Sequence, residues 1–295
     1  ASVVQTEKAL PPVKPSITVS KSSQSREAHV DVNTDLMTVR INKYGGFIEK
    51  AWLNNYPNSL NDPEPFTLLN YQDNHAFIAQ TGFTGDNHLV YTASQETVSL
   101  SHEQDTVAVR LTASNKQGVH FEKVYTFHRG QYHYEVTATV KNRSSETWTG
   151  NHYSDFTGFS DTDIKSGAIP TPKEFNVDLD APKPGWFTFN TFSGPSYYTP
   201  DTPYVKFPFA EMASKKLHKQ VPAPNWIAIQ QRYFISAWIP AAGGEQTLSS
   251  NWQNGSTGYN NGSYRQSFDL TSQGEKITLA PGAQETRVAT LYTGP

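Results

Sequence analysis

The sequence has 295 residues, of which 36% are hydrophobic and 13% aromatic, so it can build one large core or two ordinary domains. A net charge of −3 provides no basic field to hold a polyanion, which argues against nucleic acid as a partner. Cysteine is absent from the sequence, and this excludes disulfides, thiolate metal sites and a cysteine nucleophile.

The high aromatic share, with 19 glycines and 19 prolines, favours many strands joined by turns, so we predict an all-β fold. Residues 1–25 are polar and contain several prolines, and we predict a poorly ordered linker there. Residues 26–295 are predicted to form a single domain. Because no apolar run approaches the ~18 residues of a membrane span and no signal peptide is recognisable, we expect a soluble piece.

The first half of the chain contains the clearest strand patterns. Residues 36–42 and 47–53 are predicted strands joined by a turn that contains Gly45 and Gly46. Residues 54–65 hold prolines, asparagines and aspartates, which predicts a surface loop. Two alternating runs, 119–128 and 132–142, are separated by a short connection with a glycine, which predicts a hairpin.

The second half begins with residues 159–184, which are rich in Asp, Lys, Gly and Pro and are predicted to be irregular. Residues 186–192 regain strand alternation, and residues 211–219 are the best candidate for a short helix. Roughly 15 strands of ordinary length in one chain argue for two large packed sheets.

The run 225–240 is predicted to be the central strand, because it is rich in β-branched and aromatic residues. Ile229 and Trp238 should be buried, and Pro240 should end the strand, since proline lacks the N–H that a central ladder needs. A helix is the competing interpretation, but it would carry apolar groups on every face, which soluble helices rarely do.

Several blocks, in the same order from Asp35 onward, resemble the large periplasmic domain of the YidC membrane-protein insertase family of Gram-negative bacteria. The blocks are Ile41-Asn42-Lys43-Tyr44-Gly45-Gly46 with Tyr56-Pro57, Pro65-Phe66-Thr67-Leu68-Leu69, Thr81-Gly82-Phe83-Thr84-Gly85, Thr191-Phe192-Ser193-Gly194 with Tyr198-Thr199-Pro200-Asp201, Gln230-Gln231-Arg232-Tyr233-Phe234 with Ala237-Trp238-Ile239-Pro240, and Leu291-Tyr292-Thr293-Gly294-Pro295. Each block alone is weak, but their shared order is specific.

The resemblance implies a β-supersandwich similar to that of galactose mutarotase-like proteins, with two large, mainly antiparallel sheets and one or two short helices. It implies a location in the periplasm and membrane attachment through helices that are absent from this sequence. The implied partners are the Sec translocon, its accessory subunits and nascent inner-membrane proteins. The implied function is a non-catalytic module of an insertase that docks translocation components.

A carbohydrate-binding or sugar-epimerase protein is the alternative function, because this architecture also hosts mutarotases that move protons with histidines and a carboxylate. His128 and His133 flank the predicted hairpin turn and could face each other. None of the available groups stands in a distinguishing motif, so we expect no catalytic residue and no cofactor. The other groups considered are His102, His120, His152, Glu103, Glu122, Asp155 and Asp161.

The acidic residues Asp155, Asp161 and Asp163 raise the possibility of a calcium loop, but the glycine and the terminal glutamate of such a loop are missing. We therefore expect no metal site.

Aromatic residues crowd between positions 186 and 209, where they could line a groove for an extended peptide or a partner's edge. Ordinary sandwich core is the other interpretation of these residues, and the sequence leaves it open. The candidate contact surface consists of Trp186, Phe187, Phe192, Tyr197, Tyr198 and Tyr204.

Overall fold

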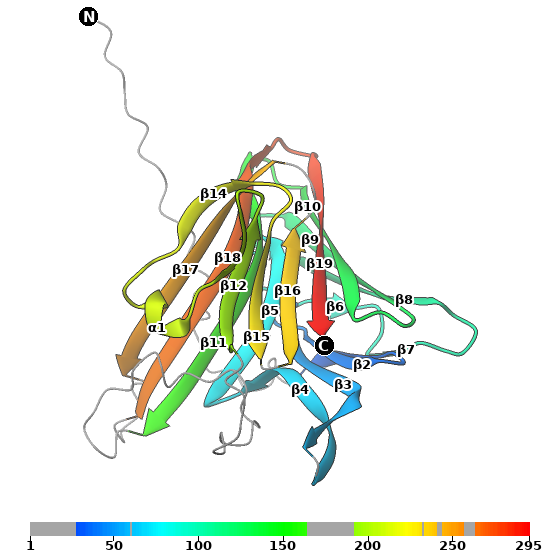
Figure 1. The fold of residues 1–295 in the computed structure, drawn as a ribbon. Coiled ribbons are helices and arrows are strands. Elements are labelled where there is room, and N and C mark those ends of the chain that lie inside the picture. Colours follow the sequence, from blue (N-terminus) through cyan, green and yellow to red (C-terminus); the bar gives the residue numbers. More distant parts are fainter. Residues whose placement is uncertain (1–27, 60, 164–191, 232, 241–243, 257–262) are drawn as a thin grey trace, which may run out of the picture.

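The computed structural model describes residues 28–59, 61–163, 192–231, 233–240, 244–256 and 263–295, which form two large packed sheets (Figure 1). The ten-stranded sheet has, in spatial order, β14 (His218–Pro222), β17 (Glu245–Ser256), β18 (Ser263–Leu279), β11 (Trp148–Asp163), β5 (His75–Phe83), β4 (Asp62–Gln72), β3 (Ile48–Ser59), β2 (Met37–Asn42), β1 (His29–Asn33) and β7 (Thr97–Ser99). The nine-stranded sheet has β13 (Thr202–Lys206), β12 (Gly194–Thr199), β15 (Trp226–Gln231), β16 (Phe234–Pro240), β19 (Gln284–Gly294), β10 (His133–Asn142), β9 (Val119–His128), β8 (Thr106–Ser114) and β6 (Thr92–Ala93).

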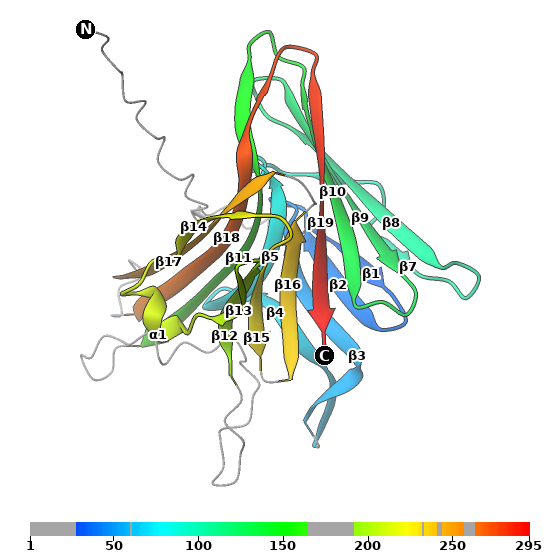
Figure 2. The ribbon, with the colours of Figure 1, turned by 45° about the horizontal axis from the view of Figure 1, so that its top comes forward.

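Neighbouring strands are antiparallel, with the exception of the pair formed by β1 and β7. The long hairpins of the nine-stranded sheet lie together on one side of the molecule (Figure 2). The single helix of the described residues, α1 (Phe209–Met212), lies next to β17. Among these residues no helix has the length and the apolar character that crossing a membrane requires.

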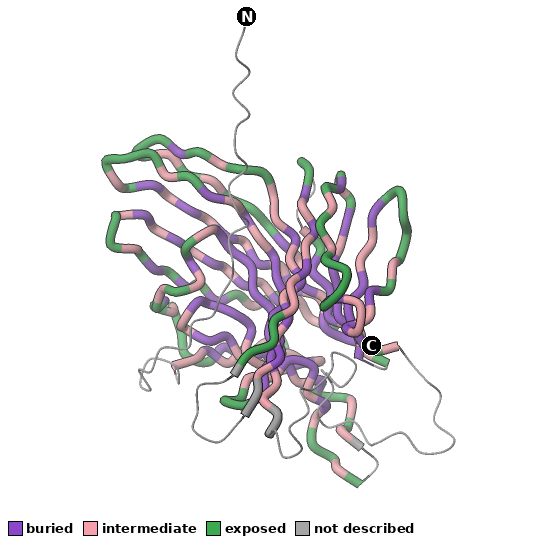
Figure 3. Tube along the Cα trace, turned by 90° about the vertical axis from the view of Figure 1, so that its left-hand side faces the viewer, coloured by how far each residue is buried: buried purple, intermediate pink, exposed green. Residues whose placement is uncertain are grey.

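The hairpin of β9 and β10 confirms the prediction made for residues 119–142. Every second residue of both strands is buried. Figure 3 shows alternation of this kind, buried and less buried residues in turn, along several strands of the fold. Gly130 in the turn has a φ of 69°, a conformation that side-chain-bearing residues rarely adopt. Phe127 and Tyr134, directly opposite each other, stack with ring centroids 4.4 Å apart.

A hydrophobic core joins the two sheets. Trp238 of β16 packs against Phe156 of β11, with ring centroids 6.4 Å apart, and its indole N–H donates to the carbonyl of Asp155 at 3.1 Å. Ile229 and Trp238 are both fully buried, as predicted. Burial of such side chains contributes about 1.5–3 kcal/mol each. β5 is buried at every position, so the middle of the ten-stranded sheet is covered on both faces.

The run 225–240 is a tight hairpin, so the prediction of one central strand is wrong. β15 and β16 pair with each other, and Gln231 lies opposite Phe234. Residues 226–239 contain no glycine, proline, asparagine or aspartate, the residues that usually mark a turn, and this hid the reversal between the two strands. Pro240 does end β16.

Three further predictions need correction. Residues 54–65 belong to β3 and β4, whose pairing contains register shifts that accommodate the prolines. Residues 159–163 continue β11 instead of starting an irregular segment. The helix is α1, which ends at Met212, and β14 occupies part of the range predicted to be helical. The predictions for residues 1–25, 164–184 and 186–191 lie outside the described residues.

Candidate functional site

The aromatic face is a group of side chains on β12, β13 and β15 that point away from the core. In β15 the side chains of Ile227 and Ile229 belong to the core, so Trp226 and Gln230 face outward on the same strand. Tyr198 of β12 lies directly opposite Trp226. Their rings stack with centroids 6.0 Å apart and an interplanar angle of 16°.

Tyr204 of β13 completes this face beside Trp226, with ring centroids 6.3 Å apart. It is 47% exposed, and its hydroxyl donates to the side-chain oxygen of Gln230 at 3.0 Å. Its φ of 54° is unusual for a residue with a side chain, and such strain often occurs at functional positions. The ammonium group of Lys206 lies 5.8 Å from the Tyr204 ring and 5.1 Å from the ring of Phe192.

The predicted contact surface is thus partly assembled. Phe192, Tyr198 and Tyr204 belong to the aromatic face, whereas Tyr197 packs against the core from the other side of β12. Trp226 was missed, because the run that contains it was interpreted as the central strand. Its alternation with Ile227 was the signal that could have placed it on the outer side.

The remaining aromatic residues of the crowded stretch divide differently. Phe207 and Phe209 are buried, and Phe209 packs against Phe268 with ring centroids 4.8 Å apart. These two therefore follow the interpretation as core. Trp186 and Phe187 lie outside the described residues.

Of the histidines considered for proton transfer, His128 and His133 lie at the adjoining ends of β9 and β10, next to the opposed pair Phe127 and Tyr134, whereas the others lie elsewhere. His128 lies 2.9 Å from a carboxylate oxygen of Glu135, on the neighbouring strand. His120 contacts the hydroxyl of Ser114 at 2.9 Å. His152 is buried near Thr81 on the other sheet. In the part of the chain that the structure describes, no group of three or more His, Cys, Asp or Glu residues is placed to hold a metal ion.

Asp155, a carboxylate considered in the sequence, lies near Asp269, which the sequence analysis did not single out. Asp155 is buried and accepts hydrogen bonds from Gln80 and Thr271 at 2.8 and 2.9 Å. The hydroxyl of Thr157 lies between the two carboxylates, 2.8 Å from Asp155 and 3.0 Å from Asp269. One hydroxyl proton serves one carboxylate at a time, so the second carboxylate is accommodated best as a protonated donor. Burial, together with the charge of Asp155, raises the pKa of Asp269 to about 8.

A buried ion pair joins β9 of the nine-stranded sheet to the loop that follows β5 of the ten-stranded sheet. Lys123 of β9 lies 3.1 Å from the carboxylate of Asp86, and their side chains are 1% and 2% exposed. Lys123 also donates to the carbonyl of Gly45 at 2.9 Å, and Tyr153 donates to Asp86 at 2.8 Å. Burial lowers the pKa of Lys123, and the Asp86 carboxylate opposes that shift. Two of the sequence blocks listed above, the one that contains Gly45 and the one that contains Gly82, thus lie next to this ion pair. A Cβ atom added at Gly82 would lie 1.9 Å from the carboxylate of Asp86.

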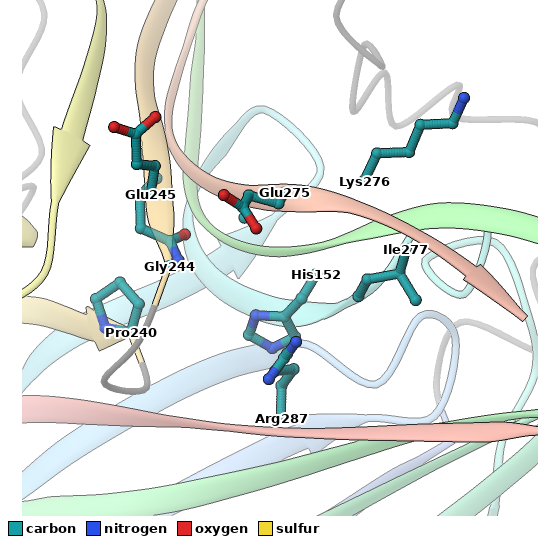
Figure 4. A pocket seen from close by; sticks show the side chains of 10 residues that line it. His152, Pro240, Gly244, Glu245, Glu275, Lys276, Ile277 and Arg287 are labelled. Atoms are coloured by element: carbon teal, nitrogen blue, oxygen red, sulfur yellow. The ribbon is translucent and has the colours of Figure 1, made fainter.

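A polar pocket of about 310 Å³ opens between the sheets, at the ends of β16 and β17 and beside β18 and β19 (Figure 4). His152 and Arg287 lie close together in it. The Nε2 atom of His152 is 3.3 Å from the hydroxyl of Thr81. Burial first, and then the charges of Arg287 and Lys123, lower the pKa of His152 to about 3, so this ring is neutral at physiological pH.

Solved structures share the fold of this chain. A galactose mutarotase-like protein from Lactobacillus casei superposes with a TM-score of 0.50, covering 90% of this chain and 99% of that protein at 8% identity. This similarity concerns the fold alone. Together with the two mainly antiparallel sheets, it confirms the predicted β-supersandwich.

Comparison with related sequences identifies the family of this chain, which similarity of fold alone does not. A protein of Alcanivorax borkumensis named membrane protein insertase YidC is 29% identical over 97% of this chain and 46% of its own length. A relative of the same name from Shewanella amazonensis is 30% identical over 90% of this chain and 44% of its own length. The chain thus spans less than half of these relatives. Residues 29–295 match the family described as the YidC periplasmic domain, so the chain belongs to this family of periplasmic domains.

Proposed function

We propose that this chain is a non-catalytic docking module of a membrane-protein insertase, and that the aromatic face contacts its partners. The proposed partners are the Sec translocon with its accessory subunits and nascent inner-membrane proteins. Family membership supports the insertase, because the relatives are named membrane protein insertase. The observation that carries the contact surface is the stack of Tyr198, Trp226 and the exposed Tyr204 on the outer side of the sheet.

The chemistry of this face suits a protein partner. Tyrosine and tryptophan present large surfaces with few rotatable bonds, and they are enriched in the centres of interfaces. Exposed apolar side chains continue along the same outer side at Ile239 of β16 and Val288 of β19, which are 42% and 36% exposed. β13 is the last strand on its side of the sheet among the described residues, and such an edge can pair with an extended segment.

The proposal that the module is non-catalytic rests on how its titratable groups are engaged. His128 pairs with Glu135, and Asp155 is surrounded by side-chain donors. The described histidines and carboxylates that a mutarotase-like reaction would need are spread over both sheets. A mutarotation assay with an aldose checks this: we expect the rate of the uncatalysed reaction. An acceleration that His128→Ala or His133→Ala removes would contradict the proposal.

We also propose that residues 26–295 unfold as one domain, since one core contains residues of both sheets. Circular dichroism and tryptophan fluorescence should report one coincident transition on heating. Two separated transitions would contradict a single domain.

Photocrosslinking in the full-length membrane protein tests the contact surface. A photoreactive amino acid is placed at positions 198, 204 and 226 on the aromatic face. Matched control positions are Asp31 and Lys50, half-buried residues on strands β1 and β3 of the other sheet. We expect crosslinks to a translocon subunit or a nascent chain from the aromatic face only. Interfaces of this kind are often weak, with Kd values around micromolar, so trapping is preferable to co-purification. Crosslinks from the control positions alone would contradict the placement.

A further inference from the structure

The small residues Ser196 and Ala228 lie on the outer side of the nine-stranded sheet, yet neither is exposed. Ser196 of β12 stands directly opposite Ala228 of β15, and each has an exposed fraction of 0%. Tyr198 and Trp226, two positions away on the same strands, stack on the outer side, so alternation puts the smaller pair on that side too. Other side chains must therefore cover Ser196 and Ala228 from outside.

The side chain of Tyr204 supplies this cover. Tyr204 belongs to β13, and β12 separates that strand from β15 (Figure 2). Its ring nevertheless lies beside Trp226 of β15, and its hydroxyl is 3.0 Å from the side-chain oxygen of Gln230, also on β15. These contacts lie two positions before and two positions after Ala228. The Tyr204 ring therefore crosses β12 and lies over Ala228 and its neighbour Ser196.

The hydroxyl of Ser196 has no use in this closed arrangement. Its Oγ atom is buried and has no hydrogen-bond partner among the residues that the structure describes. Buried hydroxyls normally have a partner, because an unpaired one has lost its hydration without replacement. The hydroxyl of Tyr204 is engaged with Gln230 and does not serve it. The slot, which we define as the space over Ser196 and Ala228 that the Tyr204 ring fills, thus contains an unused polar group.

Tyr204 is held in the slot by few contacts. It is 47% exposed, and β13 is the last strand on its side of the sheet among the described residues. Its φ of 54° is costly for a residue with a side chain, so outward movement of this edge strand allows the backbone to relax. The same movement breaks the contact with Trp226 and the hydrogen bond to Gln230. Since the gain offsets part of these losses, we expect the open position to be populated as a minor state.

The groups that hold the Tyr204 ring determine what can replace it. The indole of Trp226 packs against an aromatic ring, and the amide of Gln230 pairs with a hydroxyl, so a tyrosine from another chain suits the slot. The ammonium group of Lys206 lies 5.8 Å from the Tyr204 ring, at the rim of the slot. In the described part of the chain no carboxylate forms an ion pair with Lys206, so an acidic residue beside the incoming tyrosine complements its charge.

We propose that Tyr204 is a lid on the aromatic face, and that an extended acidic segment of a partner protein displaces it and inserts a tyrosine into the slot. The inserted hydroxyl bonds to Gln230, an adjacent carboxylate pairs with Lys206, and the hydroxyl of Ser196 gains a partner in the segment. This inference rests on the proposed docking function and adds the chemistry of the segment that docks.

A single introduced thiol tests the lid, because the sequence contains no cysteine. Ser196→Cys places the thiol under the Tyr204 ring, where iodoacetamide reaches it only when the lid opens. The matched control is Ser236→Cys, at a position that is 0% exposed on the core side of β16. We expect Ser196→Cys to be alkylated at least about tenfold faster than Ser236→Cys, since local opening is easier than global unfolding. Adding Tyr204→Ala should speed the alkylation of Ser196→Cys by about another tenfold and leave that of Ser236→Cys unchanged.

Protection of the same thiol tests the occupant. In the variant that combines Ser196→Cys with Tyr204→Ala, the probes are N-acetyltyrosine, which carries a phenol and a carboxylate, tyramine, which carries a phenol and an ammonium group, and N-acetylleucine, which has the carboxylate without the ring. We expect N-acetyltyrosine to slow alkylation saturably and at a lower concentration than the other two. Lys206→Met should remove the difference between N-acetyltyrosine and tyramine, because it removes the charge at the rim.

Several results would overturn the proposal. Alkylation of Ser196→Cys as slow as that of Ser236→Cys, or a rate that Tyr204→Ala leaves unchanged, would show that Tyr204 is no lid. Protection by tyramine or N-acetylleucine at an equal or lower concentration, or by none of the probes, would contradict the assigned occupant. If Tyr204→Ala does not fold, Tyr204→Phe removes only the hydrogen bond to Gln230 and should still speed alkylation. These measurements need no partner, so their failure is distinguishable from a failure of the docking function, which photocrosslinking reports.

Discussion

Replacing Lys123 by methionine removes the cation of the buried pair and keeps much of the side chain's volume. The carboxylate of Asp86 then remains 2% exposed without its counter-charge, and the carbonyl of Gly45 loses its donor. Removing one partner of a buried pair typically costs about 3–5 kcal/mol. Asp86 keeps donors from Tyr153 at 2.8 Å and from the backbone N–H of Phe83 at 3.2 Å. We therefore expect a loss near the lower end of this range, about 3 kcal/mol.

Urea unfolding followed by circular dichroism measures this loss, with the free energy of unfolding extrapolated to water. Lys116→Met, at an exposed position, is the matched control and should change stability by less than about 0.5 kcal/mol. The double variant Lys123→Met with Asp86→Asn removes both charges. It should be more stable than the sum of the two single losses predicts, because neither charge is then buried alone. A loss below about 1 kcal/mol for Lys123→Met, or strict additivity, would refute the reasoning.

Three other outcomes are expected. Because the pKa of Asp269 is raised to about 8, from an ordinary value of about 3.9, the folded state holds a proton that the unfolded state releases. Its contribution to stability is present below pH ~4 and is lost as pH rises towards 8, at about 1.4 kcal/mol per pH unit. Asp269→Asn should flatten the dependence of the unfolding free energy on pH between pH 5 and 8, measured by urea unfolding. An unchanged slope would contradict the conclusion that Asp269 is protonated in the folded state. Ile229→Ala should lower the free energy of unfolding by about 2–5 kcal/mol, whereas a loss under about 0.5 kcal/mol would mean an exposed strand. Gly82→Ala should destabilise the chain, because the new Cβ would lie 1.9 Å from the Asp86 carboxylate, while Gly255→Ala meets no atom within 4 Å and should be tolerated. Equal melting temperatures for these two alanine variants would show that Asp86 can move aside.

The sequence determined the class of the fold and the clearest local pairing. The alternation of residues 119–128 and 132–142 requires one buried face on each strand, and a glycine between them permits the turn, so the hairpin follows from local rules. The ordered blocks likewise identified the family that residues 29–295 match. Lys123 stands between Phe121 and Tyr125 on the buried face of its strand, a signal for a buried partner that the sequence prediction did not use.

Tertiary structure decided what depends on residues far apart in the chain. The alternation of apolar and polar residues along a strand predicts that one of its faces is covered, but it does not predict which segment covers that face. The pairing of Lys123 with Asp86 was therefore visible only in the folded structure. The same holds for the turn between β15 and β16, because residues 226–239 contain no glycine, proline, asparagine or aspartate to mark where the chain reverses. The aromatic face and the polar pocket each combine side chains from several strands. Their existence depends on register between strands, which local sequence does not encode.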